Sequence, residues 1–429
     1  MEGGAFLQDI RVDPIGPDLE IRASPQGRSV NTAPVPLPQP LSSLCNSRVI
    51  ATGDSLADLL VAQALSAAQV TPCLSTGVAL ACAFDLLVSV RFHNTIKPEN
   101  WLWCPDCGRD FHPVLNACPA CCLTHRFVHF LGNKPGSGTI GPVTSASLQD
   151  LLAALFRARG EKHKEVHSCR EPADLALLDT AERVAFFCEV KAAPLFTAPC
   201  SVVHSTETFD VGSTLPLNHR RGTMRRFHQL KVELFIPTLE GPYYLPIEGT
   251  SPGEAKWAEL GLAATLRDDA TLFPKIAMAW GDLWKLYQSK NAADPRIWFT
   301  GGCGRPRKPG EGWPTDAAGK PLSAISDGKT SVGMDRTDDI KKSTFQVLKL
   351  GVEYRAKLEA SGWQVGIGLL GNLPAARHYT DYLASYEDVA WAKAPVGEAP
   401  RQWSNLFDAI ASFTESRIRA QFLTGLLKF

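Results

Sequence analysis

The stretch PADLALLDTAERVAFFCEVK, residues 172–191, decides the predicted fold class. Two apolar runs, 173–178 and 184–190, flank a short polar segment, and this pattern is typical of a β-hairpin. Because side chains alternate along a strand, Glu189 and Lys191 share one face of the second run. Asp174 begins the first run, so its carboxylate can meet Glu189 across the hairpin. The apolar flanks indicate that the hairpin is buried rather than a solvated surface hairpin.

These three side chains suggest a chemistry. Two carboxylates this close repel each other, and a hard divalent cation relieves the repulsion. A lysine beside them can orient or help to deprotonate a water molecule, which is a workable layout for Mg²⁺-assisted phosphodiester hydrolysis. Asp179 is the second candidate for the role of Asp174. Glu161 or Glu165 would be an extra ligand, although plain surface charge is the favoured interpretation for both.

The same residues resemble the PD-(D/E)XK nuclease superfamily, in which a helix precedes a hairpin carrying the Asp and then the Glu-x-Lys, followed by a helix and another strand. Apolar periodicity predicts helices over 147–159 and 337–359 and a strand over 363–370, an order compatible with that core. One departure is that Ala173 separates Pro172 from the Asp. The resemblance implies that Asp174 and Glu189 hold Mg²⁺ and that Lys191 assists the attacking water.

A second motif is formed by Cys104, Cys107, Cys118 and Cys121, with the spacing C-x2-C-x10-C-x2-C. Two such pairs supply the four thiolates of a tetrahedral zinc site, and a closed shell of four thiolates indicates a structural rather than a catalytic ion. Four incidental buried cysteines are the weaker interpretation, and iron is the alternative metal. The fourth ligand is the least certain, and its alternatives are Cys122, His112 and His125.

Charge restricts how the chain can bind a polyanion. The 429 residues include 44 Lys plus Arg and 44 Asp plus Glu, so DNA binding must rest on local basic patches. No acidic residue lies between Asp210 and Glu233. The basic residues predicted there to contact DNA are Arg220, Arg221, Arg225, Arg226 and Lys231, and a second cluster comprises Arg305, Arg307 and Lys308. A solvated face is the alternative for both.

Other features bear on location and on rival functions. No secretory signal and no apolar run of membrane length is found, so a cytoplasmic protein without membrane contact is expected. Gly53-Asp54-Ser55-Leu56 resembles the nucleophile block of GDSL-type esterases, but no His follows an Asp at the spacing of that family. Ser55 is therefore predicted to cap a helix. The Gly-rich segment 132–142 lacks the ending of a phosphate-binding loop, so no nucleotide cofactor is expected.

Together these features predict a mixed α/β fold: a PD-(D/E)XK core, with a central mixed sheet flanked by helices, a small four-cysteine zinc module and a long insertion. The predicted divisions are an N-terminal arm and helical region 1–100, a zinc module 101–131, a nuclease core 143–375 with a DNA-recognition insertion 192–335, and a helical C-terminal segment 376–429 whose last helix spans 401–427.

The whole chain resembles a type II restriction endonuclease, which implies site-specific, Mg²⁺-dependent cleavage of double-stranded DNA by a homodimer at a palindromic target. One alternative is another nuclease on the same core, such as a transposon-end or repair enzyme. Another is a non-enzymatic, zinc-stabilised DNA-binding protein, and the esterase is the third.

Overall fold

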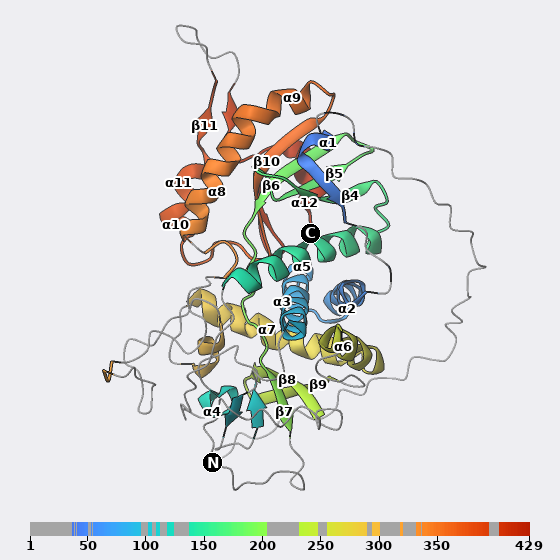
Figure 1. Cartoon of the computed structure of the whole chain (residues 1–429), viewed down its shortest axis with the longest axis vertical. Coiled ribbons are helices and arrows are strands. Elements are labelled where there is room, and N and C mark those ends of the chain that lie inside the picture. The colour runs from blue at the N-terminus through green and yellow to red at the C-terminus, as the bar shows by residue number, and fades with distance from the viewer. Residues whose placement is uncertain are drawn as a thin grey trace, which may run out of the picture. The chain divides into compact units, whose positions relative to one another are not determined.

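The hairpin of residues 172–191 lies inside a seven-stranded sheet (Figure 1). The structure, a computed structural model, describes residues 41–49, 55–95, 102–104, 109–111, 118–123, 137–203, 231–247, 255–289, 294–300, 318–320, 332–335, 337–393 and 403–429, with residues 37, 39 and 53. The helices and strands given below belong to the unit Pro38–Phe429.

The large sheet is mixed. Its strands, in spatial order, are β1 (Cys45–Arg48), β4 (Lys164–Cys169), β5 (Leu175–Asp179), β6 (Val184–Val190), β10 (Gln364–Gly371), β13 (Ala409–Ser412) and β14 (Ser416–Ile418). Neighbours from β1 to β6 are antiparallel. β10 is parallel to both β6 and β13, and β14 is antiparallel to β13. The prediction of a mixed α/β chain with a mixed central sheet is confirmed, including the hairpin and the strand over 363–370.

Helices flank this sheet. α5 (Ser137–Ala158) contacts β4, and α8 (Thr337–Leu350) contacts β6 and β10 before continuing through the π-helical turn η5 (Gly351–Arg355) into α9 (Ala356–Glu359). The apolar stripe predicted for α5 is fully buried in the main core. Its predicted start near Ser147 is wrong, because the helix begins ten residues earlier and includes Pro142. Ser147 lies inside the helix, where its side chain binds a neighbouring helix instead of capping this one.

A second, antiparallel sheet contains the cysteine-rich segment. Its strands, in spatial order, are β2 (Leu102–Cys104), β3 (Arg109–Phe111), β7 (Cys200–Val203), β8 (Lys231–Thr238) and β9 (Gly241–Ile247), and the short helix α4 (Pro119–Leu123) follows β3. β3 pairs with β7, which is the next strand along the chain after β6. The cysteine-rich segment and part of the predicted insertion therefore form one sheet.

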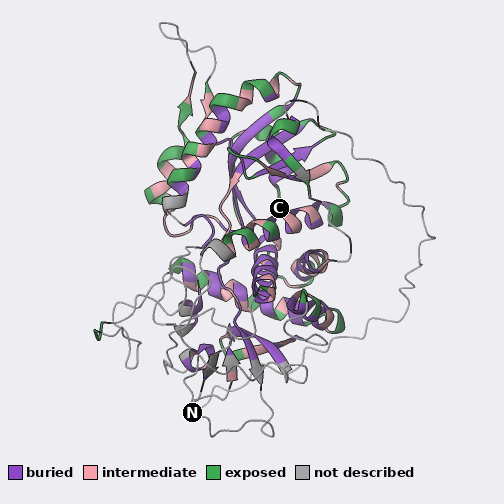
Figure 2. Cartoon of the chain, viewed as in Figure 1, coloured by how far each residue is buried: buried purple, intermediate pink, exposed green. Residues whose placement is uncertain are grey.

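A layer of helices joins the two sheets (Figures 1 and 2). It comprises α2 (Leu56–Val70), α3 (Thr76–Asn94), α5, α6 (Trp257–Asp268) and α7 (Leu272–Ser289). α3 contacts the other four, while α6 packs on β9 and α7 on β8. Within the described part of the chain, α3 alone has the length and apolar composition of a membrane span, but 83% of its most apolar window is buried in the fold. A helix that is apolar on all sides is typical of such a core position.

The C-terminal segment differs from its prediction. The helix expected over 401–427 is wrong, because the segment contains β12 (Ser404–Asn405), β13, β14, the short turn η6 (Gln421–Leu423) and the one-turn helix α12 (Thr424–Leu427). All residues of β13 are buried, and a short continuous apolar run suits an internal strand paired on both edges. The remaining short elements are α1 (Leu41–Leu44), η4 (Pro295–Phe299), α10 (Tyr379–Tyr382), α11 (Ala384–Glu387) and β11 (Ala390–Trp391).

Candidate active site and metal centre

Asp174 and Glu189 lie opposite each other at one end of the large sheet. Leu175 pairs with Cys188, so continuing the antiparallel register places Asp174 across from Glu189. The backbone N–H of Asp174 donates to the Cys188 carbonyl at 3.1 Å. The Asp174 carboxylate in turn accepts the backbone N–H of Val190 at 2.9 Å. This side-chain hydrogen bond fixes the carboxylate beside the end of β6.

Lys191 completes the constellation. Its Nζ lies 2.8 Å from Oε1 of Glu189, and both side chains are largely buried, at 16% and 13% exposed. Its backbone N–H donates to the Leu370 carbonyl at 2.8 Å, which extends the parallel pairing of β6 with β10. The structure thus brings together the three residues that the hairpin pattern predicted to meet.

The electrostatics of the site suit a hard cation. Burial raises the pKa of the Glu189 carboxyl, and repulsion by Asp174 raises it further, while Lys191 opposes both effects. The two carboxylates form an oxygen-rich donor set of the kind that a hard divalent cation binds. The residues present therefore fit a hard divalent cation such as Mg²⁺, for which Asp174 and Glu189 would be the protein ligands.

The structure separates Asp179 from this site. Asp179 is the last residue of β5, at the other end of this strand from Asp174. It pairs with Val184 at the start of β6. Its Oδ1 accepts the backbone N–H groups of Ala181 and Glu182 at 3.1 and 3.0 Å. Asp179 therefore shapes the turn of the hairpin, which is the usual local role of an Asp in that position.

The two glutamates upstream are engaged elsewhere. Glu161 lies before β4 and accepts from Lys164 Nζ at 2.7 Å. Glu165 pairs in register with Leu178, four residues along β5 from Asp174, and binds Arg48 at 2.9 Å and His167 at 2.8 Å. The hydrogen bond from His167 lowers the pKa of Glu165. Both carboxylates belong to ion pairs near the far end of the sheet.

The second candidate site is a cluster of cysteines. Cys104 ends β2, Cys118 precedes α4 and Cys121 lies within it; all three are buried, and their sulfurs lie within 4.8 Å of one another. The Cys104 and Cys121 sulfurs are 3.7 Å apart, close to the ~3.8 Å between two sulfurs at the corners of a tetrahedral Zn–S site. The cluster could hold a metal ion. Cys107, His112 and His125 lie outside the described residues, as does the side chain of Cys122.

Arg109 lies on β3, directly opposite Cys104 of the cluster in the strand register. On β3, its Nη1 lies 2.9 Å from Oε2 of the buried Glu233 on β8, and its guanidinium carbon lies 3.9 Å from the centre of the Tyr244 ring on β9. A single side chain therefore ties three strands to one another. Sequence reasoning missed this residue, because the isolated pattern of β3 carries no signal of its partners more than a hundred residues away.

A polar stripe on α3 holds the segment that follows β6. Asp85 accepts the backbone N–H groups of Leu195 and Phe196 at 3.3 and 2.9 Å, and the indole N–H of Trp280 at 2.6 Å. Burial raises the pKa of Asp85, whereas these donors oppose the shift. In the sequence, the charged residue Asp85 interrupts the apolar run of this helix. That interruption could have indicated the polar stripe.

One and two turns further along α3, two more side chains bind the same segment. The Ser89 hydroxyl accepts the backbone N–H of Ala198 at 2.9 Å, and His93 Nε2 lies 2.7 Å from the Ala198 carbonyl oxygen. The chain between β6 and β7 is thus fixed to α3 by side-chain hydrogen bonds, in addition to a β-bridge between Phe196 and Thr300.

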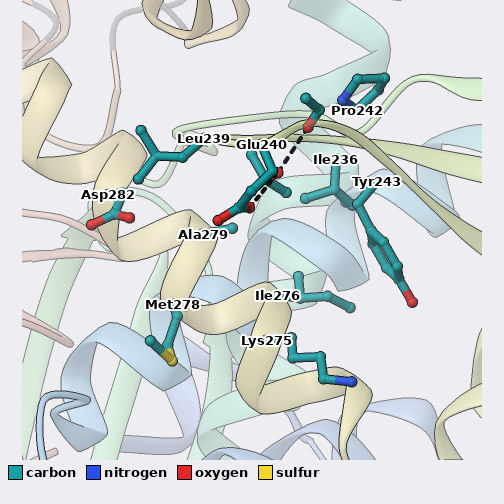
Figure 3. A pocket seen from close by; sticks show the side chains of 12 residues that line it. Ile236, Leu239, Glu240, Pro242, Tyr243, Lys275, Ile276, Met278, Ala279 and Asp282 are labelled. Carbon is teal, nitrogen blue, oxygen red and sulfur yellow. Dashed lines mark hydrogen bonds between the residues drawn. The ribbon is translucent and has the colours of Figure 1, made fainter. Parts of the chain in front are cut away.

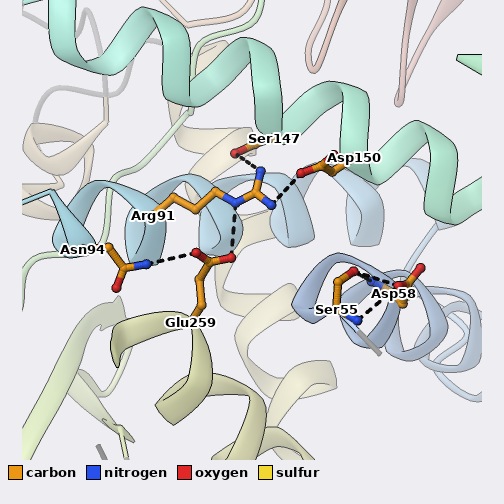
Figure 4. A network of polar contacts seen from close by, with 7 residues as sticks. All are labelled: Ser55, Asp58, Arg91, Asn94, Ser147, Asp150 and Glu259. Carbon is orange, nitrogen blue, oxygen red and sulfur yellow. Dashed lines mark hydrogen bonds and ion pairs between the residues drawn. The ribbon is translucent and has the colours of Figure 1, made fainter. Parts of the chain in front are cut away.

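Figure 4 shows a further polar network in the helical layer. Arg91 on α3 binds Asp150 on α5 at 2.6 Å and Glu259 on α6 at 3.3 Å. In the same view, Ser55 caps α2, forming a capping box with Asp58. The helix-cap prediction for Ser55 is confirmed, and its hydroxyl donates to the Asp58 carboxylate at 2.7 Å.

A cavity of about 470 Å³ lies between the β8–β9 hairpin and α7 (Figure 3). Apolar side chains line most of it, and the carboxylates of Glu240 and Asp282 stand at its edge. None of the predicted catalytic or cysteine residues lines it. Lys275 lines the cavity as well, so its charged side chains are two carboxylates and one amine.

Most of the basic residues predicted to contact DNA lie outside the described residues, namely Arg220, Arg221, Arg225, Arg226, Arg305, Arg307 and Lys308. Lys231 begins β8, but its side chain likewise lies outside them. Comparison of the chain with protein-family models, with curated proteins and with solved structures finds no match. The function of the protein is therefore inferred from the geometry of the site.

Proposed function

We propose that this protein is a Mg²⁺-dependent endonuclease that cleaves double-stranded DNA at a specific site, as a type II restriction enzyme does. The observation that carries the proposal is the meeting of Asp174, Glu189 and Lys191 at one end of β6. A structural hairpin on the protein surface needs no pair of carboxylates at one strand end with a largely buried lysine in hydrogen-bonding distance. This arrangement therefore favours a functional role.

The order of elements supports the same proposal. α5 precedes the antiparallel strands β4, β5 and β6, and α8 then leads to β10, which lies parallel to β6. This is the helix, hairpin, helix and strand order that the resemblance to PD-(D/E)XK nucleases implies. Glu189 lies near the carboxyl end of β6, and Asp174 directly precedes β5 at the same end of the hairpin, which supports the resemblance.

The proposed chemistry assigns each side chain a task. A bound Mg²⁺ would stabilise negative charge on the phosphoryl oxygen and would lower the pKa of a water molecule bound to it. Asp174 is fixed by the Val190 N–H and Glu189 by Lys191, so both carboxylates are oriented before a cation binds. Lys191 Nζ is held at the same place, where it can orient the attacking water and donate to charge that develops on the phosphate.

The remaining parts of the proposal concern binding. A structural Zn²⁺ on the cysteine cluster would stabilise the five-stranded sheet. Since the chain has no net charge, the Arg-rich segment 220–231 is proposed to supply phosphate contacts. A cytoplasmic homodimer would match the two-fold symmetry of a palindromic site.

The test is digestion of plasmid and phage DNA by the purified protein with Mg²⁺ or with EDTA. Discrete Mg²⁺-dependent fragments are expected, and Glu189→Ala and Lys191→Ala should each lower the cleavage rate by about 10²-fold to 10⁴-fold. Lys285→Ala is the matched control, because it removes an exposed lysine from an ion pair on α7. Its rate should equal that of the wild-type protein.

Three results would change the proposal. Full cleavage by Glu189→Ala would refute the site. A smear of fragments would keep the nuclease and remove sequence specificity, which favours a repair-type or transposon-end enzyme. Intact DNA, together with retained specific binding by zinc-loaded protein, would favour the non-enzymatic DNA-binding alternative, which the cysteine cluster supports.

A further inference from the structure

We propose that Asn372 is a positioning residue for Lys191, acting as a side-chain clamp on the backbone just beyond the catalytic strand β6. The inference rests on the proposed nuclease function, whose reaction depends on where Lys191 Nζ is held. Asn372 follows β10 directly and is fully buried. Its hydrogen bonds go to the backbone that follows Lys191 rather than to the two carboxylates or the cysteine cluster.

The clamp consists of two hydrogen bonds to one residue. Asn372 Oδ1 accepts the backbone N–H of Ala193 at 3.0 Å, and its Nδ2 donates to the Ala193 carbonyl at 2.8 Å. A primary amide offers one acceptor and two donors, so it reproduces both bonds that a neighbouring strand would make. Ala193 lies two residues after Lys191, whose own N–H donates to the Leu370 carbonyl.

The local sequence explains why a side chain makes these bonds. Pro194 follows Ala193, and proline lacks the N–H group that a continuing strand would need. Backbone pairing of β6 with β10 therefore stops, and Asn372 provides the last pair of bonds from the side. The amide of Asn372 is itself fully buried, whereas Ala193 is partly exposed.

The chain at Gly371 approaches Lys191 closely. A Cβ at position 371 would lie 2.7 Å from the Lys191 carbonyl oxygen, which leaves no room for a side chain. The turn after β10 can therefore lie directly against residues 191–193 only because this position is glycine. Lys191 is held on one side by Leu370 and on the other through the clamped Ala193.

Loss of the clamp should affect catalysis more than binding. Without the Asn372 side chain, Ala193 loses two hydrogen bonds. Lys191 keeps its bonds to Leu370 and Glu189, but the backbone beyond it can shift and move Nζ relative to Asp174. A misplacement of about 1 Å at a reacting group costs on the order of 10²-fold in rate. DNA affinity depends on other parts of the surface and should not change.

The experiment compares Asn372→Ala with a matched control, Asn94→Ala. Asn94 also makes two hydrogen bonds, accepting from the Ala258 N–H at 2.9 Å and donating to Glu259 at 2.9 Å, but it lies in the helical layer. Asn372→Ala should lower kcat by about 10-fold to 100-fold, with KM and DNA affinity in Ca²⁺ within twofold of wild type. Asn94→Ala should lower the melting temperature and leave kcat unchanged.

Asn372→Asp gives a readout that a merely structural role would not produce. Its ionised carboxylate accepts the Ala193 N–H but repels the Ala193 carbonyl, whereas the protonated carboxyl both accepts and donates as the amide does. Burial favours the protonated form. The kcat of Asn372→Asp relative to wild type should therefore rise as the pH falls from 8 to 6, well below the melting temperature. This variant also keeps the test decisive if Asn372→Ala does not fold.

The possible failures are distinguishable. Absence of cleavage by the wild-type protein would refute the proposed function, and the role of Asn372 with it. Wild-type cleavage together with an unchanged kcat for Asn372→Ala, or a pH-independent ratio for Asn372→Asp, would refute the positioning role alone. An Asn372→Ala variant with a higher KM and weaker DNA affinity but an unchanged kcat would also refute the positioning role.

Discussion

Acidification should destabilise this protein through His93. The imidazole is fully buried on α3, and its Nε2 lies 2.7 Å from the Ala198 carbonyl oxygen. In the neutral ring, an Nε2–H can donate to that carbonyl while the side chain remains uncharged. Burial lowers the pKa of His93 from 6.5 to about 4, although the hydrogen bond to Ala198 opposes the shift. The folded protein therefore resists protonation of this residue.

The sign and size follow from linkage. Because the folded pKa is lower than the unfolded pKa, the unfolded chain takes up the proton first. The contribution of His93 is fully present above pH 6.5 and is lost as the pH falls toward 4. A difference of about 2.5 pKa units corresponds to about 3 kcal/mol in total, of which about 2 kcal/mol is lost between pH 8 and pH 5.

The assay is urea unfolding of the wild-type protein and of His93→Gln at several values from pH 8 to pH 5, with zinc in fixed excess. Glutamine keeps an N–H donor for the Ala198 carbonyl but does not titrate. The free energy of unfolding of the wild type should fall by about 2 kcal/mol more than that of His93→Gln. Parallel pH profiles for the two proteins would refute the assignment of a buried neutral imidazole to this position.

Two further predictions concern the five-stranded sheet. The purified protein should contain bound zinc, and Cys121→Ser should release it and lower the free energy of unfolding by several kcal/mol; a metal-free wild-type protein by elemental analysis would contradict this. Arg109→Ala, which removes the ion pair with the buried Glu233, should destabilise the protein by about 3 kcal/mol in urea. The exposed Arg417 pairs with Glu415, and Arg417→Ala should cost at most about 1 kcal/mol.

The parts of the fold that the sequence predicts well are those whose signals are local. The hairpin is identified from two apolar runs separated by polar residues, and its alternation alone places Glu189 and Lys191 on one face. The helix over 337–359 and the strand after it are found for the same reason. Strand β4 is missed, because Lys164–Cys169 has a mixed polar pattern and is held by pairing with β5.

The incorrect predictions have one physical cause. In each, contacts with distant parts of the chain determine the structure, against the local sequence pattern. The sequence indicates a helix start near Ser147 and Asp150, yet Asp150 is an ion-pair partner of Arg91, 59 residues away in the chain. β13 is predicted as part of a helix, because a short buried apolar run has no periodicity that distinguishes the two structures. Its pairing with β10 decides the outcome.

The long insertion shows how the candidate site tolerates so much additional structure. The chain leaves β6 at Lys191 and returns near Gly333, whose N–H donates to the Ala193 carbonyl at 3.1 Å. The departing and returning segments are thus bonded to each other, and Asn372 binds the same residue across 179 positions of sequence. Because both ends of the insertion meet beside Lys191, the strands β7, β8 and β9 and the helices α6 and α7 can be inserted without separating β6 from α8 and β10. A DNA contact made by the inserted part would then be linked to β6 through this bonded junction, in addition to the α3 side chains that hold residues 195–198.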